Sequence, residues 1–150
     1  MLLAIDVGNT NTVFAIFKGE TLVDSWRLRT ESGRSGDEYA GFLHQVFELS
    51  GLKLKKIQDV IVSSVVPEAN FHITALCEKY MGAQPVFITK DNVPIKLDVE
   101  RPGDVGADRL VNAVAVKVHY KTPAIVIDFG TATTFDVIDA QGAYAGGVIA

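Results

Sequence analysis

Two short polar loops, each directly after an apolar run, carry residues that could hold phosphate and a metal ion. The first is Asp6-Val7-Gly8-Asn9-Thr10-Asn11-Thr12, which follows residues 2–5. Glycine lets the backbone approach a ligand closely, and N–H groups and hydroxyls in a tight turn bind anionic oxygens. A carboxylate cannot bind phosphate directly, so Asp6 implies an intervening Mg²⁺ ion or water. The loop is a candidate phosphate site, although an ordinary hairpin turn is also rich in Asn and Thr.

The second loop repeats the first. Asp128-Phe129-Gly130-Thr131-Ala132-Thr133-Thr134 follows the apolar residues 124–127 and matches the first loop at its Asp, its Gly and its final Thr. Threonine suits strands, which explains Thr133 and Thr134 but leaves unexplained a carboxylate at the end of a buried strand. Asp128 is therefore a candidate cation ligand. We expect the two loops to face one another.

A third motif, Gly103-Asp104-Val105-Gly106-Ala107-Asp108-Arg109, lies where a loop enters a predicted helix. Aspartate is common at helix starts, so Asp104 or Asp108 could be no more than a cap. Arginine in a first turn opposes the helix dipole, and a substrate carboxylate bound bidentately by Arg109 would compensate it. Asp108 is then well placed to accept a proton from a substrate hydroxyl.

The elements that must position these motifs follow from apolar periodicity and turn residues. A meander of three strands opens the chain, and Ser35-Gly36-Asp37-Glu38 has the form of a capping box at a helix start. The predicted strands are 2–7, 12–17, 22–28, 59–65, 85–88, 124–127, 135–138 and 144–149, and the predicted helices are 35–51, 67–82 and 106–120, the last with Leu110, Val111, Val114, Ala115 and Val118 on its apolar face.

This order predicts an α/β protein in which helices pack on a mixed sheet and a second copy of the unit then begins. We place the first domain at residues 1–120 and the incomplete start of the second at 121–150. The second meander would lack covering helices, so the side chains of Ile125, Ile127, Phe135 and Val137 are expected to be exposed or to need a partner.

Composition narrows the class of partner. The 150 residues are 48% hydrophobic with a net charge of −4, and no dense run of Lys or Arg suggests a nucleic-acid partner. No basic region precedes the first apolar residues, and no apolar run approaches the length of a membrane span, so we expect a cytoplasmic protein without a membrane partner. Cys77, the only cysteine, lies in an apolar helical pattern and is predicted to be a core residue.

Four segments together resemble the type III pantothenate kinases: Asp6 to Thr10, Ser63-Ser64-Val65-Val66-Pro67, Val105 to Arg109, and Asp128 to Thr134. The first pattern is common to the wider superfamily of acetate kinases, sugar kinases, heat-shock chaperones and actin, whereas Gly106-Ala107-Asp108-Arg109 is specific to this family. One difference is that family members often carry a tyrosine where this chain has Val99-Glu100-Arg101.

The resemblance implies a ribonuclease-H-like, actin-like ATPase fold and a homodimer that phosphorylates pantothenate with ATP, the first step of coenzyme A biosynthesis. It implies a catalytic base at Asp108, a site for potassium or ammonium at Asp128, and Mg²⁺ bound with ATP near Asp6. It assigns pantothenate binding to Gly106, Ala107, Asp108 and Arg109, and ATP binding to Asp6, Val7, Gly8, Asn9, Thr10, Asn11, Thr12, Val13 and Thr131.

Two alternatives remain at this point. The same two loops serve other small-molecule kinases and phosphohydrolases of the superfamily, against which Gly106 to Arg109 argues. A non-catalytic regulator would bind nucleotide or a partner without turnover. Because the family continues beyond Gly146-Gly147-Val148-Ile149, we expect this chain to be a fragment without measurable kinase activity of its own.

Overall fold

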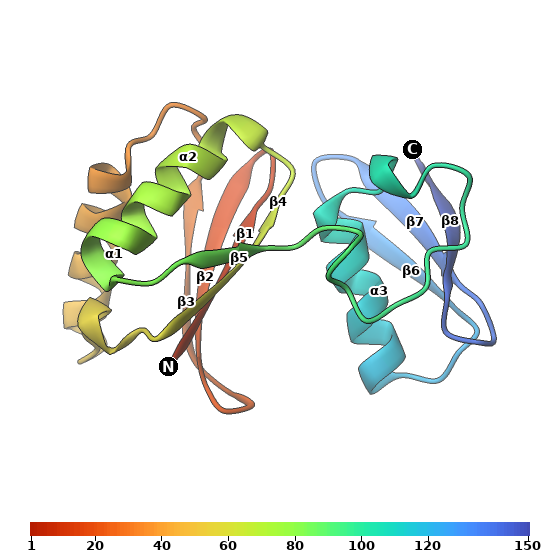
Figure 1. The fold of residues 1–150 in the computed structure, drawn as a ribbon, viewed down its shortest axis with the longest axis horizontal. Coiled ribbons are helices and arrows are strands. Elements are labelled where there is room, and N and C mark those ends of the chain that lie inside the picture. The colour runs from red at the N-terminus through yellow and green to blue at the C-terminus, as the bar shows by residue number, and fades with distance from the viewer. The chain divides into compact units, whose positions relative to one another are not determined.

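The computed structural model describes residues 1–150 and divides into two units, Met1–Phe87 and Ile88–Ala150 (Figure 1). Alternate residues are buried along the first strands. In β1 (Leu2–Val7) and β2 (Asn11–Lys18) every second side chain enters the core, as expected for strands with one face against helices. β3 (Thr21–Arg29) pairs with β2 and completes the antiparallel meander.

The first sheet is mixed. β4 (Asp59–Ser64) pairs parallel to β1, β5 (Pro85–Phe87) pairs parallel to β4, and the strand order is β3-β2-β1-β4-β5. The helices α1 (Gly36–Leu49) and α2 (Pro67–Leu76) cover one face of this sheet (Figure 1). The predicted α/β architecture, with a mixed sheet and helices packed on it, is confirmed.

The first helix begins where the capping box predicts. Glu38 N donates to Ser35 Oγ at 3.2 Å, and Ser35 N donates to Glu38 Oε2 at 2.8 Å. Its buried face holds Tyr39, Leu43 and Phe47. Helix α1 is therefore defined by local signals as well as by packing.

The second helix is predicted as one segment ending at Gly82, but its last turn widens. After α2, residues Cys77–Met81 form a π-helical turn that ends at Gly82, whose φ is +67°. Cys77 is fully buried, and burial raises the pKa of its thiol to about 12. This high pKa keeps the thiol protonated, so the prediction of a core cysteine is confirmed.

The second unit is built on an antiparallel sheet of β6 (Ala124–Phe129), β7 (Thr133–Ile138) and β8 (Tyr144–Ile149). The helix α3 (Ala107–His119) packs against β6 and β7. A small core of its own forms from Ile95, Ala113, Ile138 and Tyr144.

The predicted apolar face of α3 is confirmed in part, since Leu110 is buried and Val114 packs against the core of the second unit. Arg109 contacts β7, Ala113 is buried in that core and Val116 packs against it, so the side of α3 toward the sheet also includes these three residues. Val118, predicted on the apolar face, is 66% exposed. The apolar pattern of this helix is broad, and a pattern alone does not say which part meets the sheet.

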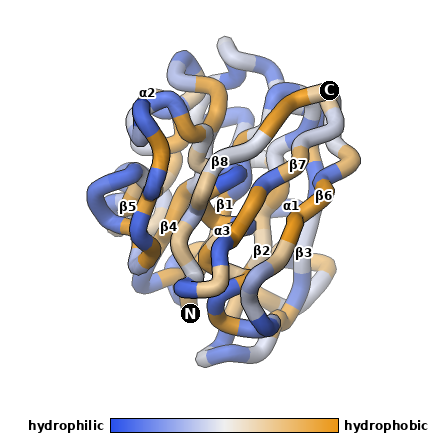
Figure 2. Tube along the Cα trace, turned by 90° about the vertical axis from the view of Figure 1, so that its right-hand side faces the viewer, coloured by the Kyte–Doolittle hydropathy of each residue, from blue (hydrophilic) through white to orange (hydrophobic).

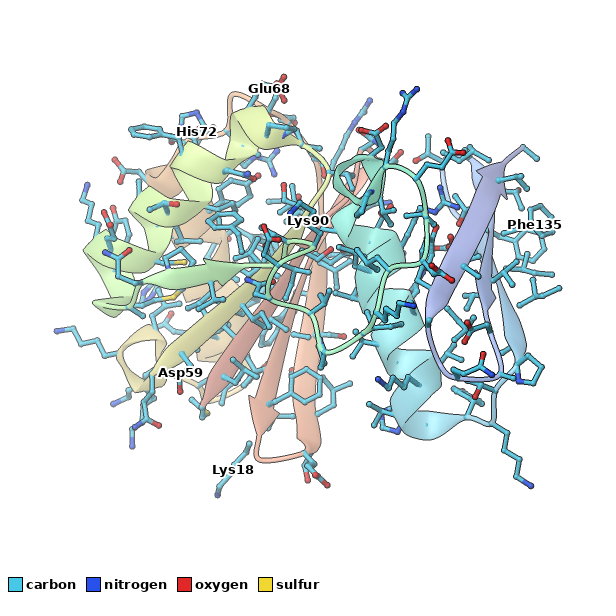
Figure 3. All side chains as sticks on the ribbon, turned by 45° about the vertical axis from the view of Figure 1, so that its right-hand side comes forward. Lys18, Asp59, Glu68, His72, Lys90 and Phe135 are labelled. Atoms are coloured by element: carbon cyan, nitrogen blue, oxygen red, sulfur yellow. The ribbon has the colours of Figure 1, made fainter.

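The other face of the three-stranded sheet is apolar and uncovered within this unit. Ile125 pairs with Val137, and Ile127 pairs with Phe135, so their side chains share a face. Ile125, Ile127 and Val137 are exposed, as predicted, and Phe135 is partly buried on the side away from α3 (Figure 3). The hydrophobic end of β8 leads to the C-terminus (Figure 2).

The division of the structure falls at residues 87 and 88, whereas the sequence analysis places the domain boundary near residue 120. The difference arises because α3 packs on the second sheet. The boundary at residue 120 stays a prediction for the complete protein. None of the helices has the length and apolar character needed to cross a membrane.

Candidate active site

The loop after β1 is a tight hairpin held by backbone and threonine hydrogen bonds. Val7 pairs with Thr12, and Gly8 N donates to Asn11 O at 3.0 Å. A side chain at Gly8 would press on that carbonyl, because an added Cβ would lie 3.2 Å from Asn11 O. Asp6, Asn9 and Thr10 are exposed at this end of the sheet, so their polar groups can reach a ligand.

Thr30, which the sequence analysis did not single out, fixes the loop from the end of β3. Its hydroxyl donates to Gly8 O at 2.7 Å, and its N–H donates to Thr10 O at 2.9 Å. The Thr12 and Thr30 hydroxyls lie 2.9 Å apart, and since Thr30 donates to Gly8, the Thr12 hydroxyl is the donor of this bond. Thr12 is fully buried, so within the predicted ATP-binding segment it holds the loop in shape.

The third motif lies at the start of α3, where the sequence analysis places it. Gly106 is the N-cap residue, with no side-chain cap, and its carbonyl accepts from Arg109 N and Leu110 N at 3.1 Å. Asp108 Oδ1 accepts from Arg109 N at 2.8 Å. The Asp108 carboxylate is partly exposed and lies in the first turn of the helix.

Arg109 is paired inside the second unit. Its Nε donates to Asp136 Oδ1 at 2.6 Å, and Nη2 donates to Phe135 O at 3.4 Å. Asp136 is fully buried, and the Arg109 side chain is 14% exposed. The sequence analysis expected an anion to compensate this arginine, and Asp136 is the anion that the structure supplies at Nε.

Tyr144 completes this cluster from the start of β8. Its hydroxyl donates to Asp136 Oδ1 at 2.7 Å, and the Arg109 guanidinium carbon lies 6.0 Å from the centre of its ring. Burial, and then the hydrogen bond to Asp136, raise the pKa of Tyr144 well above its ordinary value. The phenol is therefore a permanent donor to Asp136 at neutral pH.

The second loop lies at the end of β6, as predicted. Asp128 is exposed, and its Oδ2 accepts from Asn112 Nδ2 at 3.3 Å, so Asp128 lies beside α3. Asn112 comes three residues after Arg109 along that helix. Gly130 N donates to Ala132 O at 3.1 Å, which closes the turn, and Thr131 is exposed at its tip. Within the second unit, α3 thus meets Asp128 and Asp136 through two side chains spaced three residues apart.

The donors in this loop are oxygens, which suit hard cations. Asp128 offers a carboxylate, and backbone carbonyls are the usual ligands of potassium in proteins. No group of three or more His, Cys, Asp or Glu side chains lies together. Asp128 could therefore contribute one carboxylate oxygen to a site for a hard cation.

Sequence reasoning missed four residues that hold the predicted site residues in place: Thr30, Asn112, Asp136 and Tyr144. Asp136 alone had a signal, since it shares a strand face with the buried Ile138 and an aspartate at such a position needs a partner. The predicted residues fall into both units: Asp6 to Val13 in the first, and Gly106 to Arg109, Asp128 and Thr131 in the second. That the two loops face one another stays a prediction.

The mixed sheet order and helix arrangement described above define the actin-like ATPase fold, and solved structures share it. An activator of 2-hydroxyisocaproyl-CoA dehydratase from Clostridium difficile, solved with bound ADPNP, has this fold with a TM-score of 0.58 at 17% identity, over 99% of this chain and 45% of its own. The ethanolamine utilization protein EutJ from Carboxydothermus hydrogenoformans has a TM-score of 0.52 at 16% identity, over 99% and 50%.

The sequence comparisons are more specific. The profile of the type III pantothenate kinases matches residues 2–150, and the chain belongs to this family, as the sequence analysis predicted. The type III pantothenate kinase of Syntrophotalea carbinolica is 52% identical over all of this chain and 59% of its own length. That of Paramagnetospirillum magneticum is 50% identical over 99% of this chain and 58% of its own. The chain thus spans somewhat more than half the length of these relatives.

Proposed function

We propose that the full-length gene product transfers the γ-phosphate of ATP to the hydroxyl of pantothenate. The observation that carries this proposal is the family match over residues 2–150, which includes Gly106 to Arg109. The product would be 4'-phosphopantothenate, so the enzyme would catalyse the first step of coenzyme A biosynthesis. A cytoplasmic homodimer is the form in which we expect it to act.

ATP is proposed to lie at the Asp6 to Val13 loop and at Thr131. The backbone of the Gly8 turn offers N–H groups to the phosphates, and Asp6 would bind them through Mg²⁺. The rigid hairpin supports this role, because preorganised donors need no reorganisation when charge develops in the transition state. Phosphoryl transfer depends mainly on such positioning and charge stabilisation.

Asp108 is proposed as the base. The acceptor oxygen of pantothenate forms a bond to the γ-phosphorus while the bond from that phosphorus to the β,γ-bridging oxygen breaks, ADP leaves, and the hydroxyl proton passes to Asp108. The Oδ1 atom is engaged by Arg109 N, and this bond orients the carboxylate so that Oδ2 can accept the proton. Arg109 would bind the pantothenate carboxylate.

Asp128 is proposed to hold potassium or ammonium together with Thr131 and backbone carbonyls of the same loop. When bound, such a cation offsets negative charge near the phosphates. Asn112 supports the proposal because its amide holds Asp128 Oδ2 at 3.3 Å and so limits the orientations of that carboxylate.

The test is pantothenate-dependent release of ADP by the purified full-length protein, with mass spectrometry of the phosphorylated product. The matched control is Asp108→Asn, which preserves shape but removes the base. ATP hydrolysis without pantothenate, or phosphorylation of another alcohol in preference to it, would indicate one of the related kinases or phosphohydrolases. Nucleotide binding without turnover would indicate a regulator.

A further inference from the structure

A buried carboxylate in the second unit holds the arginine that the proposed function assigns to the substrate. Asp136 lies in the middle of β7, between Phe135 and Val137, and is fully buried. One of its oxygens, Oδ1, accepts from both Arg109 Nε at 2.6 Å and the Tyr144 hydroxyl at 2.7 Å. Two donors from two different elements therefore converge on one atom.

The hydrogen bonding of this cluster is incomplete, which is unfavourable for stability. The second oxygen, Asp136 Oδ2, is buried without a hydrogen-bond partner. A buried polar atom without a partner costs free energy, and apolar residues of similar volume often replace buried ion pairs without loss of stability. The retained cost indicates a role for the pair beyond joining α3 to β7.

The geometry leaves part of the guanidinium for a ligand. Nε and Nη2 have protein acceptors in Asp136 and Phe135 O, whereas the hydrogen bonds of Arg109 leave Nη1 unused. The guanidinium is planar, so fixing one edge fixes the direction of the others. An anion at Nη1 would therefore meet a donor of set orientation.

Gly147 makes room for this arrangement. It pairs with Asp136 across β7 and β8, and a Cβ at this position would overlap Arg109 Nη2 and Phe135 O. Any other residue here would displace the guanidinium or the strand. The space beside β8 is thus occupied by the arginine head group instead of a side chain.

We propose that Asp136 and Tyr144 are positioning residues that orient Arg109 toward the carboxylate of the acceptor substrate and so set selectivity for acidic over neutral acceptors. The inference rests on the proposed function, because it needs an acceptor that carries a carboxylate. It places specificity on residues that act through the arginine, to which Asp136 is bonded directly and Tyr144 through Asp136.

The test compares kcat/KM of the full-length protein for pantothenate and for pantothenol, which has a neutral alcohol in place of the carboxylate. Tyr144→Phe is the sharpest variant, because it removes one hydrogen bond to Asp136 without changing any charge. We expect it to lower the pantothenate-to-pantothenol ratio several-fold, and Asp136→Asn to lower it about tenfold or more. The loss should fall on KM for pantothenate, with kcat changed less.

Arg109→Met serves as the reference, since it should abolish the preference, and adding Asp136→Asn to it should lower the ratio no further. Asp139→Asn is the matched control. Asp139 accepts from Gln141 N at 2.9 Å and Ala143 N at 2.8 Å in the β7–β8 turn and has no bond to Arg109. Its loss should affect both acceptors equally.

Two results would overturn the inference alone: a pantothenate-to-pantothenol ratio that is unchanged in Tyr144→Phe, whether or not both values fall, or a ratio that rises in Asp136→Asn because Asp136 acts mainly as a counter-charge. If Asp136→Asn does not fold, Tyr144→Phe decides by the same ratio. A wild-type protein that phosphorylates neither compound would instead refute the proposed function, and the inference would fall with it.

Discussion

Asp108 and Arg109 are neighbours in the chain, yet the structure gives their side chains different surroundings. Asp108 is partly exposed and is bonded only through the N–H of Arg109, whereas Arg109 extends into a buried cluster with Asp136. A helix start separates them in this way because successive residues point about 100° apart around the axis. Asp108 can therefore remain accessible to a reacting hydroxyl while Asp136 fixes the side chain of Arg109.

Replacing the proposed base tests the first of these residues. Asp108→Asn in the full-length protein should lower kcat by about 10²-fold or more, because a positioned base contributes about 10²–10⁴-fold. Pantothenate binding, measured by calorimetry, should change little, since the amide retains the bond from Arg109 N. A kcat within a few-fold of the parent would remove the role from Asp108.

Exchange of the monovalent cation tests Asp128. If this carboxylate helps to bind potassium near the ATP phosphates, replacing potassium by sodium at constant ionic strength should depress the kinase rate sharply. Asp128→Asn should remove most of that difference, because the charged ligand is gone. Equal rates in the two salts would exclude the cation from the mechanism.

At the scale of elements, local sequence signals predicted most of the helices and strands. They did not predict the contacts between segments that are distant in the sequence. The capping box at Ser35 and the alternation of Leu3, Ile5 and Val7 act within a few residues, so sequence patterns report them directly. The bond from Arg109 to Asp136 depends instead on how α3 docks on β7. A pattern shows that a helix has an apolar face without showing what that face meets.

The start of α1 offers a test of such a local signal. Ser35→Ala should lower the free energy of unfolding of the first unit by about 1 kcal/mol, since it removes an N-cap hydroxyl. Trp26, the only tryptophan, packs on Phe47 of α1 with ring centres 4.9 Å apart, so its fluorescence during urea unfolding reports on this unit. Ser32→Ala, an exposed position just before the cap, is the matched control and should change little.

The same helix start predicts a pH dependence. Hydrogen bonds from Ser35 N and Oγ hold the pKa of Glu38 below its ordinary value of 4.5. A carboxyl whose pKa is lowered on folding stabilises the fold above its unfolded value, and this contribution is lost as pH falls through the folded value. The difference between wild type and Ser35→Ala should therefore shrink below pH 4.5. A difference that stays constant to lower pH would show that the bond from Ser35 Oγ to Glu38 contributes nothing.

At the scale of the whole molecule, the uncovered face of β6, β7 and β8 determines how a chain of residues 1–150 should behave. Ile125 is 67% exposed, Phe129 is 82% exposed and Val148 is 62% exposed on this sheet. Contiguous apolar surface of this kind is a liability in an isolated molecule, and strand surfaces are especially prone to associate.

We predict that this chain self-associates through that face at micromolar concentration, which light scattering coupled to size exclusion over a dilution series would measure. Ile125→Lys should reduce the association, because burying an unpaired charge at the centre of an apolar contact is costly. Leu49→Lys is the matched control: Leu49 is 88% exposed but lies alone on α1, so the same charge there should leave the association unchanged. If wild type and both variants were monomers at every concentration, the apolar face would not drive assembly. If Leu49→Lys reduced the association as much as Ile125→Lys, the change in net charge would be the cause of the reduction.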